Sequence, residues 1–343
     1  MAACFSSSFK FACPPIYVLS QIPNLAKCLE QCALPGVQIK SIDVTDVCTE
    51  NPLLDEERRN AVKDAEIAVC DGMLLAKNYK HMPNLKWAHC TWAGIDPFVK
   101  VIQDLHDEPK FTLTRHSGEA FCSSMAEYVM CHILNSERQT KLCWKNQESK
   151  IWSLEEKVRN TRNLDELTIS ILGVGNMASE IAKFLKSRGA TVYGFARNPR
   201  LFTQFGYFDR ITAELDGVLL DCDYLCNTLP YTPLTCGILS TSVFQKFRKK
   251  PVFINVGRGN IISENELVQA LKTGCLSGAV LDVFEIEPLP ESSPLWNIPE
   301  VTITPHIAAL SKPEDIGEEF FRVFSSYTEG HDLKNVVNWS TYY

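Results

Sequence analysis

A strand, a glycine-rich turn and a helix follow one another without a break over residues 168–190, TISILGVGNMASEIAKFLKSRGA. The apolar start predicts a buried strand, and the pattern that follows fits G-x-G-x-x-A with Gly173, Gly175 and Ala178 at its fixed positions. The first glycine permits a tight turn, the second admits a pyrophosphate close to the backbone, and a small third residue lets helix and strand pack closely. This stretch therefore predicts the first βα unit of a dinucleotide-binding domain.

Short apolar strands alternate with helix-like stretches along most of the chain. The expected strands are IYVLS (16–20), EIAVC (66–70), KWAHC (86–90), FTLTR (111–115), TISILG (168–173), TVYGFA (191–196), DYLCNTL (223–229), PVFINV (251–256), GAVLDVF (278–284) and VTIT (301–304). That alternation predicts an α/β fold with parallel sheets covered by helices. A long helix-like segment over residues 119–139 separates the first four strands from six that describe a doubly wound domain. Ser263 and Glu266 form a candidate capping box, with Gly274 at the end of that helix.

Length and charge limit the function classes. The chain has 343 residues, of which 45% are hydrophobic and 22% charged, and this predicts two globular domains. The net charge of -7 and the pI near 5.6 argue against a nucleic acid or an anionic membrane surface as the partner. No apolar stretch is long enough to span a bilayer, and no secretory signal begins the chain. We therefore expect a cytoplasmic protein acting on a small molecule, with organelle import through residues 1–15 as the minor alternative.

The 14 cysteines do not predict a zinc site or a disulfide framework. No C-x-x-C occurs, and the close pairs Cys28/Cys32 and Cys222/Cys226 have no histidine at zinc-finger spacing. Reduced core or surface thiols are the expected state. The histidines other than His306 show no ligand spacing either, so we predict no metal.

Three short stretches in the C-terminal part carry an Arg, a Glu and a His in fixed order. They are NVGRGN with Arg258, LDVFEIEPLP with Glu287 and TPHIAAL with His306. An Arg side chain binds a planar carboxylate through two parallel hydrogen bonds, and a His held by a carboxylate can carry a proton near neutral pH. Together they suit a 2-oxo acid, in which a carboxylate lies beside a reducible carbonyl. We therefore predict these three residues to be catalytic.

The stretch GFARNPR, which ends the second strand of the dinucleotide-binding domain, bears on the choice of cofactor. Ala196 stands where an acidic residue would hydrogen-bond the ribose of NAD, and Arg197 and Arg200 follow it. Loss of the acid and gain of two cations favour the 2′-phosphate of NADP(H). The alternative is that both arginines are ordinary surface charges and that NAD(H) is used.

The ordered motifs of this chain resemble those of the D-2-hydroxyacid dehydrogenases, in particular the glyoxylate/hydroxypyruvate reductase branch. Besides the stretches given above, the resemblance includes WAGID at 92–96, GEAFCSSMAEYV at 118–129 and LPYTPLT at 229–235, so that it covers nearly the whole chain. Departures are Cys122 and Ser123, where relatives often carry Gly, and Ala308, where the nearest reductases often place Gly.

The resemblance implies a Rossmann cofactor domain of residues 119–308, inserted into a flavodoxin-like substrate domain of residues 1–118 and 309–343. It also implies a homodimer formed through an arm of about residues 119–153. The predicted cofactor contacts are Gly173, Gly175, Asn176, Met177, Ala178, Ala196, Arg197, Asn198, Arg200, Leu229, Pro230, Val256, Arg258, Asp282 and His306. The predicted substrate contacts are Ala93, Gly94, Arg258 and His306.

In the mechanism that the resemblance implies, NADPH delivers a hydride to C2 of the 2-oxo acid while His306 gives a proton to the carbonyl oxygen. Glu287 would orient the imidazole and stabilise its protonated form. Arg258 would bind the substrate carboxylate and polarise the carbonyl, and the backbone amides of Ala93 and Gly94 would bind the carboxylate as well. Asp282 matches the ligand of the nicotinamide carboxamide.

Two alternatives stay open. A non-catalytic, dinucleotide-sensing binding protein, like the transcriptional corepressors that resemble these dehydrogenases, would carry the same Arg, Glu and His. The other alternative keeps the enzyme class and changes the substrate to phosphoglycerate, formate or a bulky 2-oxo acid. Formate is disfavoured, because its oxidation forms no alkoxide for a histidine to protonate.

Overall fold

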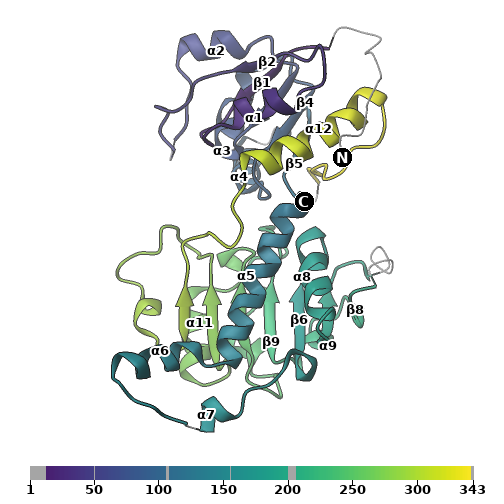
Figure 1. The fold of residues 1–343 in the computed structure, drawn as a ribbon. Helices are drawn as coiled ribbons and strands as arrows, with labels where there is room; N and C mark the ends of the chain where they lie inside the picture. The colour runs from purple at the N-terminus through teal and green to yellow at the C-terminus, as the bar shows by residue number, and fades with distance from the viewer. Residues whose placement is uncertain (1–12, 50, 106–107, 155, 200–205, 341–343) are drawn as a thin grey trace. The chain divides into compact units, whose positions relative to one another are not determined.

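The computed structural model describes residues 13–49, 51–105, 108–154, 156–199 and 206–340 (Figure 1). Contacts divide the chain into two compact units, the first of Met1–Gly118 with Ser311–Tyr343 and the second of Glu119–Leu310. The second unit is therefore an insertion in the first. The chain returns to the first unit at Ser311, whereas the sequence-based boundary lies at residue 309.

The first unit is built on a five-stranded parallel sheet of the order β2-β1-β3-β4-β5. Its strands are β1 (Ile16–Leu19), β2 (Ile39–Ser41), β3 (Ile67–Cys70), β4 (Trp87–Cys90) and β5 (Thr112–Arg115). This is the flavodoxin-like strand order. The sequence analysis missed β2 because this edge strand has three residues with little buried apolar surface. The other strands, which are apolar and largely buried, lie where they were predicted.

Helices cover this sheet, and one of them comes from the end of the chain. They are α1 (Leu25–Cys32), α2 (Glu56–Val62), α3 (Gly72–Asn78), α4 (Asp96–Leu105) and α12 (Pro313–Glu329). The fully buried Trp87 of β4 stacks on Phe320 of α12 with ring centroids 5.2 Å apart, and on Tyr327 at 4.7 Å. Burial of such large rings is worth several kcal/mol, so α12 is an integral part of the first unit.

The second unit contains a seven-stranded parallel sheet of the order β12-β11-β10-β9-β6-β7-β8. Its strands are β6 (Thr168–Leu172), β7 (Thr191–Phe195), β8 (Arg210–Thr212), β9 (Tyr224–Asn227), β10 (Val252–Asn255), β11 (Gly278–Leu281) and β12 (Val301–Ile303). The chain starts at β6 in the middle, runs outward to β8, then returns to β9 and runs to β12. The α/β fold with two doubly wound parallel sheets is thus confirmed, although the short edge strand β8 was not predicted.

The helices of the second unit are α5 (Glu119–Glu137), α6 (Thr140–Glu148), α7 (Glu156–Arg159), α8 (Asn176–Lys186), α9 (Asp216–Leu219), α10 (Thr241–Phe244) and α11 (Glu264–Lys272). The predicted long helix is α5, which packs beside α8 against the sheet (Figure 1). At the start of α11, Ser263 Oγ accepts a hydrogen bond from the Glu266 amide at 3.3 Å. The Glu266 carboxylate accepts from the Thr241 amide of α10, which connects the two helices. Gly274 follows α11 with a φ of +70°, as a helix C-terminus in the left-handed region requires.

Among the described residues, no helix combines the length and the apolar character that crossing a membrane requires.

Candidate active site

The glycine turn after β6 lies at the switch point of the second sheet, between β6 and β9. Gly173 has a φ of +107°, and a Cβ at this position would lie 2.5 Å from Thr228 Oγ1. The Gly173 amide donates to the Phe195 carbonyl at 3.0 Å, and Thr228 Oγ1 donates to the Leu172 carbonyl at 2.9 Å. Both conformation and space therefore require glycine, and ligands of doubly wound sheets bind at this point.

Helix α8 begins directly after this turn, with Gly175 as its N-cap. Asn176 and Met177 form the first turn of the helix, and the buried Ala178 packs in the core of the second unit with Ile169 of β6. The helix N-terminus presents backbone N–H groups and a positive dipole end, which fits a phosphate. The predicted glycine motif thus has the geometry of a dinucleotide-binding turn.

The end of β7 carries the residues predicted to select the cofactor. Ala196 is buried and its amide donates to the Thr212 carbonyl of β8 at 3.0 Å. Arg197 and Asn198, which follow it, are exposed. Arg200 lies outside the described residues. Because no acidic side chain stands at Ala196, this position offers no carboxylate to the hydroxyls of a ribose.

Arg258 lies in a tight turn after β10, and the glycines on both sides of it are required by space. A Cβ on Gly257 would lie 2.7 Å from the Leu229 carbonyl oxygen, and a Cβ on Gly259 would lie 1.8 Å from the Phe284 carbonyl carbon. The turn therefore contacts backbone on both sides, which fixes the position of the half-buried Arg258 between them. One guanidinium nitrogen, Nη1, donates to the Gly257 carbonyl at 2.7 Å.

A network of asparagines supports the same turn. Asn227 and Asn255 end the neighbouring strands β9 and β10 in register, and Asn227 Nδ2 donates to Asn255 Oδ1 at 2.8 Å. Asn227 Oδ1 accepts from the Leu229 amide, while Asn255 Oδ1 accepts from the Gly257 amide. This network also holds three predicted cofactor contacts close to the Arg258 turn: Leu229 and Pro230, which follow β9, and Val256, which follows β10. The sequence analysis missed both asparagines, although an amide in an otherwise apolar buried strand is the signal that marks them.

Glu287 and His306 are in direct contact. His306 Nδ1 lies 2.8 Å from Glu287 Oε2, and Glu287 Oε1 accepts from the Phe284 amide at 2.8 Å. The side chain of His306 is 50% exposed and that of Glu287 is 36% exposed. Because Nδ1 contacts Glu287, the other ring nitrogen of His306, Nε2, is the atom available to a ligand. This is the geometry of a histidine oriented by a carboxylate.

Opposing effects set the protonation of Glu287. Partial burial opposes its ionisation, but the hydrogen bonds from His306 and from the Phe284 amide, with the positive charges of His306 and Arg258, hold the pKa of Glu287 below its ordinary value. The charge of Arg258 acts on Glu287 because the two loops lie close together. The structure thus brings the three residues predicted to be catalytic into one site, with Glu287 ionised at neutral pH.

Asp282, predicted to bind the nicotinamide carboxamide, makes several contacts with the loop that carries His306. It is 1% exposed. Its Oδ1 accepts from Thr304 Oγ1 at 2.6 Å and from the Ile307 amide at 2.8 Å, and its Oδ2 accepts from the Ala308 amide at 2.9 Å. The contact with this loop was not expected from the sequence.

In the first unit, polar contacts position the loop with Ala93 and Gly94. Thr91 Oγ1 donates to Asp71 Oδ1 at 2.6 Å, and Arg115 Nη1 donates to the Ala93 carbonyl at 3.1 Å. Asp71 also accepts from the Gln21 amide at 2.7 Å. This buried carboxylate, which the sequence analysis missed, therefore connects the ends of three neighbouring strands, β1, β3 and β4.

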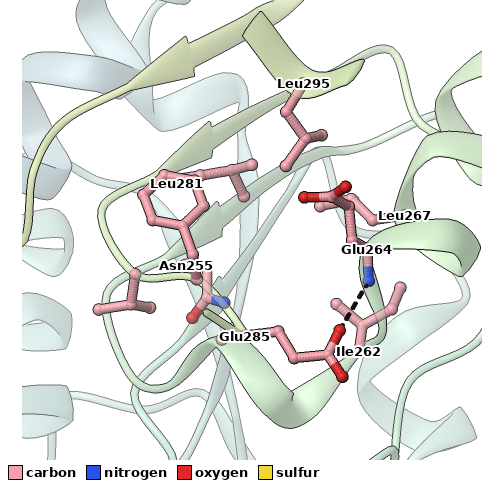
Figure 2. A pocket seen from close by; sticks show the side chains of 10 residues that line it. Asn255, Ile262, Glu264, Leu267, Leu281, Glu285 and Leu295 are labelled. Atoms are coloured by element: carbon pink, nitrogen blue, oxygen red, sulfur yellow. Dashed lines mark hydrogen bonds between the residues drawn. The ribbon is translucent and has the colours of Figure 1, made fainter. Parts of the chain in front are cut away.

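A small pocket is lined by residues that end or follow β10 and β11 and by the start of α11 (Figure 2). It is lined by Asn255, Leu281 and Leu295 and by the carboxylates of Glu264 and Glu285, of which Glu285 accepts from the Glu264 amide. Its interior of about 20 Å³ has room for about one water molecule. A pocket of this size is too small for a dinucleotide or a 2-oxo acid, so we regard it as a packing feature of the loops.

Three buried side chains of the first unit that could bind a metal come together through the fold: His89, His116 and Glu319. The sequence analysis predicted no metal, and Glu319 lies far from both histidines in the chain. His116 Nδ1 forms an ion pair with Glu319 Oε2, and Glu319 Oε1 accepts from Asn335 Nδ2 at 3.1 Å. The Ser117 amide also donates to this carboxylate. Protein donors already surround the carboxylate, which favours a structural ion pair over a metal site.

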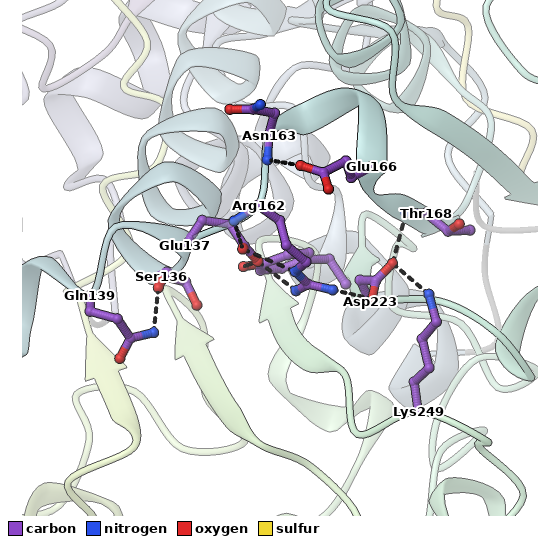
Figure 3. A network of polar contacts seen from close by, with 10 residues as sticks. Ser136, Glu137, Gln139, Arg162, Asn163, Glu166, Thr168, Asp223 and Lys249 are labelled. Atoms are coloured by element: carbon purple, nitrogen blue, oxygen red, sulfur yellow. Dashed lines mark hydrogen bonds and ion pairs between the residues drawn. The ribbon is translucent and has the colours of Figure 1, made fainter. Parts of the chain in front are cut away.

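A second charged network lies at the opposite end of the second sheet (Figure 3). Arg162 donates to both oxygens of the buried Glu137, at 2.6 Å from Nη2 and 3.1 Å from Nε, and its Nη1 donates to the buried Asp223 at 2.6 Å. Lys249 Nζ and the Thr168 amide also donate to Asp223. The network therefore fixes the end of α5 to the starts of β6 and β9, far along the strands from the catalytic loops.

Comparison with known proteins identifies the class. Residues 130–308 match the NAD binding domain of the D-isomer specific 2-hydroxyacid dehydrogenases, and this match spans half of the chain. The chain belongs to the D-isomer specific 2-hydroxyacid dehydrogenase family. The resemblance stated from the motifs is thereby confirmed.

Individual relatives are similar in sequence and in fold. The glyoxylate/hydroxypyruvate reductase A of Yersinia enterocolitica is 36% identical over 205 residues, which cover 59% of this chain and 63% of the relative. The NADPH-dependent glyoxylate/hydroxypyruvate reductase of Sinorhizobium meliloti, solved with NADP and sulfate, is 28% identical with a TM-score of 0.80 over 96% of this chain and 99% of that chain. A family member from Aeromonas salmonicida is 30% identical with a TM-score of 0.79, over 94% and 98% of the two chains.

Proposed function

We propose that this protein reduces a small 2-oxo acid, glyoxylate or hydroxypyruvate, to the D-2-hydroxy acid with NADPH. The observation that carries the proposal is the His306–Glu287 hydrogen bond beside Arg258, within a unit that has the fold and the turn of an NAD binding domain. The similar reductases from Yersinia and Sinorhizobium support the choice of substrate.

The residues fit a dinucleotide in three places. The turn of Gly173 and Gly175 with the N-terminus of α8 would hold the pyrophosphate, and Arg197 with Arg200 would hold a 2′-phosphate. Asp282 Oδ2 accepts one hydrogen bond from the loop and would accept a second from the carboxamide of the nicotinamide. When bound, reduced nicotinamide supplies the hydride.

The three catalytic residues would divide the remaining work. Arg258 binds the carboxylate of the 2-oxo acid and polarises its carbonyl. His306, protonated at both nitrogens, gives the proton on Nε2 to the carbonyl oxygen as it becomes an alkoxide. Glu287 accepts the hydrogen bond from Nδ1 and stabilises the imidazolium, for which it must stay ionised.

Steady-state reduction of glyoxylate, hydroxypyruvate, pyruvate and a longer branched 2-oxo acid, each with NADPH and with NADH, tests the proposal. We expect turnover of roughly 1–1,000 per second with the two small substrates and higher kcat/KM with NADPH. His306→Asn should lower kcat at least 100-fold with little change in NADPH affinity. Tight NADPH binding without reduction of any 2-oxo acid would contradict the proposal and favour a dinucleotide-sensing protein.

The cofactor preference needs a test of its own. Arg197→Ala should raise the KM for NADPH about tenfold and leave the KM for NADH unchanged, because only NADPH carries the 2′-phosphate. Lys183→Ala is a matched control, since this exposed cation of α8 forms its ion pair with Glu180. Equal or better efficiency of the wild-type enzyme with NADH would show that the arginines are ordinary surface charges.

We also propose a homodimer formed through the arm, as well as a cytoplasmic location. Four large apolar side chains on and after α6 are exposed: Trp144 by 61%, Ile151 by 54%, Trp152 by 96% and Leu154 by 59%. Several large apolar side chains exposed in one short segment are typical of a surface buried in an assembly. The double variant Trp144→Asp/Trp152→Asp should change a dimer to a monomer in light scattering, whereas a monomeric wild type would refute the assembly.

A further inference from the structure

Three polar side chains behind the catalytic histidine form a continuous chain of hydrogen bonds. Tyr128 Oη of α5 lies 2.7 Å from Thr304 Oγ1, and Thr304 Oγ1 donates to Asp282 Oδ1 at 2.6 Å. The residues come from three separate parts of the second unit: α5, the end of β12 and the end of β11. The sequence analysis assigned no role to Tyr128 or Thr304.

The direction of each hydrogen bond in this chain follows from chemistry. An ionised carboxylate only accepts, so the single proton of the Thr304 hydroxyl points to Asp282. Thr304 Oγ1 must then accept in its contact with Tyr128, which makes the phenol the donor. Burial raises the pKa of Tyr128, so the phenol keeps the proton that this arrangement needs.

Asp282 in turn binds the loop that carries His306. Its two carboxylate oxygens accept from the amides of Ile307 and Ala308, and its backbone carbonyl accepts from the His306 amide at 2.9 Å. The amides of three successive residues are thus bound by one buried aspartate. A rotation of the Asp282 side chain would release two of these three bonds.

His306 needs such support because of its backbone conformation. Its φ is +55°, in the left-handed region that a side chain with a Cβ disfavours by about 1 kcal/mol or more. A conformation of this kind persists only where surrounding contacts determine it. The same conformation aims the imidazole at Glu287, so its loss would also weaken the His306–Glu287 hydrogen bond.

We propose that Tyr128 and Thr304 are positioning residues, which hold Asp282 and through it keep the catalytic His306 oriented toward Glu287. The proposal rests on the proposed function for the role of His306. Neither Tyr128 nor Thr304 has to contact the substrate, since both act through Asp282. One further titratable group adjoins the chain: the ring of His132, on the next turn of α5, lies 4.4 Å from the ring of Tyr128. Burial lowers the pKa of His132, although the charge of Asp282 acts in the opposite direction.

Thr304→Val is the central test, because valine keeps the shape and removes both hydrogen bonds. We expect kcat for the 2-oxo acid to fall about tenfold and the KM values for NADPH and for the 2-oxo acid to change less than twofold. The high-pH limb of the kcat profile should move to lower pH, since a weaker bond to Glu287 stabilises the imidazolium less. Tyr128→Phe should give the same changes in smaller measure, and Thr304→Ser, which keeps the hydroxyl, should restore wild-type values.

Tyr224→Phe is the matched control for a general loss of stability. Tyr224 Oη donates to the buried Glu137 at 2.7 Å, at the opposite end of the sheet, so this variant loses a tyrosine hydrogen bond away from the site. It should lower the melting temperature at least as much as Tyr128→Phe, because a hydrogen bond to a carboxylate is stronger than one to a hydroxyl, and should leave the pH profile unchanged. A Thr304→Val enzyme with wild-type kcat and pH profile would overturn the proposal, as would the same kinetic change in Tyr224→Phe.

A second measurement separates this proposal from the proposed function. A hydrogen-bonded imidazole N–H exchanges slowly and gives its own NMR signal, which His306→Asn would assign to His306. We expect that signal in the wild type and its loss in Thr304→Val. If the wild type reduced no 2-oxo acid and the signal still depended on Thr304, the proposed function would fail and the positioning role would stand. A signal unaffected by Thr304→Val would refute the positioning role whatever the activity.

Discussion

Acidification should destabilise the first unit through its buried histidine, His89. This side chain is 0% exposed, and its Nδ1 lies 2.9 Å from Thr114 Oγ1. Burial lowers the pKa of His89 from 6.5 to about 4, against the charge of Glu319 and with that of His116. His89 is therefore neutral in the folded protein at any pH well above 4.

The sign of the effect follows from proton linkage. The unfolded chain takes up a proton at His89 near pH 6.5, whereas the folded protein does so only near pH 4. Stability from this group is complete above pH 6.5 and is lost as the pH falls from 6.5 to 4. At about 1.4 kcal/mol per tenfold rise in proton concentration, the loss of unfolding free energy is about 1.4 kcal/mol at pH 5.5 and about 2.5 kcal/mol at pH 4.5.

Urea unfolding at pH 7.0, 5.5 and 4.5 measures this loss in the wild type and in His89→Asn, whose amide can still hydrogen-bond Thr114. Tryptophan fluorescence, to which the fully buried Trp87 of the first unit contributes, is a suitable signal. Other groups titrate in both proteins, so the difference between their pH dependences isolates His89. We expect the variant to lose about 2.5 kcal/mol less than the wild type between pH 7.0 and 4.5.

A control variant, His331→Asn, removes a histidine of the same unit whose side chain is 69% exposed, and should keep the wild-type pH dependence. The reasoning is refuted if His89→Asn and the wild type lose the same free energy of unfolding on acidification. That result would mean that the pKa of His89 in the folded protein is not lowered from its ordinary value.

Other predictions follow from the same structure. Arg162→Met should destabilise the second unit by about 2 kcal/mol in urea unfolding, because two buried carboxylates lose a cationic partner; the loss is moderate because the Arg162 side chain is itself partly exposed. The control Arg248→Met removes an exposed ion pair with Asp221 and should have no effect. Equal losses in the two variants would contradict this prediction. Gly259→Ala should cost at least about 2 kcal/mol and most of the activity, since its Cβ would lie 1.8 Å from the Phe284 carbonyl carbon. Gly206→Ala is the control, because its Cβ would meet nothing within 4 Å and its backbone is not in the left-handed region. Glu287→Gln should move the high-pH limb of kcat to lower pH by about one unit, because the imidazolium loses its carboxylate partner, and an unchanged profile would exclude Glu287 from that role.

The sequence predicted most of the fold because buried parallel strands are apolar runs separated by helices. It missed β2 and β8, each a three-residue strand at one edge of its sheet, where exposure removes the apolar signal. The candidate catalytic residues Arg258, Glu287 and His306 could be proposed because they stand in recognisable motifs. The second boundary between the units was displaced slightly, since the chain between β12 and α12 has no periodic pattern that marks where contacts change.

The supporting residues could not be predicted in the same way. Asp71, Asn227 and Thr304 are single polar residues next to apolar strands, and a sequence does not show which partner each will meet. His89 and Glu319 are separated by most of the chain and come together only when α12 packs on the first sheet. Motifs therefore identify groups that do chemistry, while long-range hydrogen bonds that hold those groups appear only with the fold.

The supporting residues of the second unit follow a geometric rule. Asn227, Asn255, Asp282 and Thr304 stand at the carboxyl ends of β9, β10, β11 and β12, which are consecutive neighbours in the sheet. Each binds the backbone or the side chain of a catalytic loop or of its neighbour. Because parallel strands end at the same edge, one row of polar side chains can fix several loops at once. Substitutions at Asp282 and Thr304 should therefore lower kcat through the orientation of His306, whereas substitutions at Asn227 and Asn255, which hold the Arg258 turn, should also raise the KM for the 2-oxo acid.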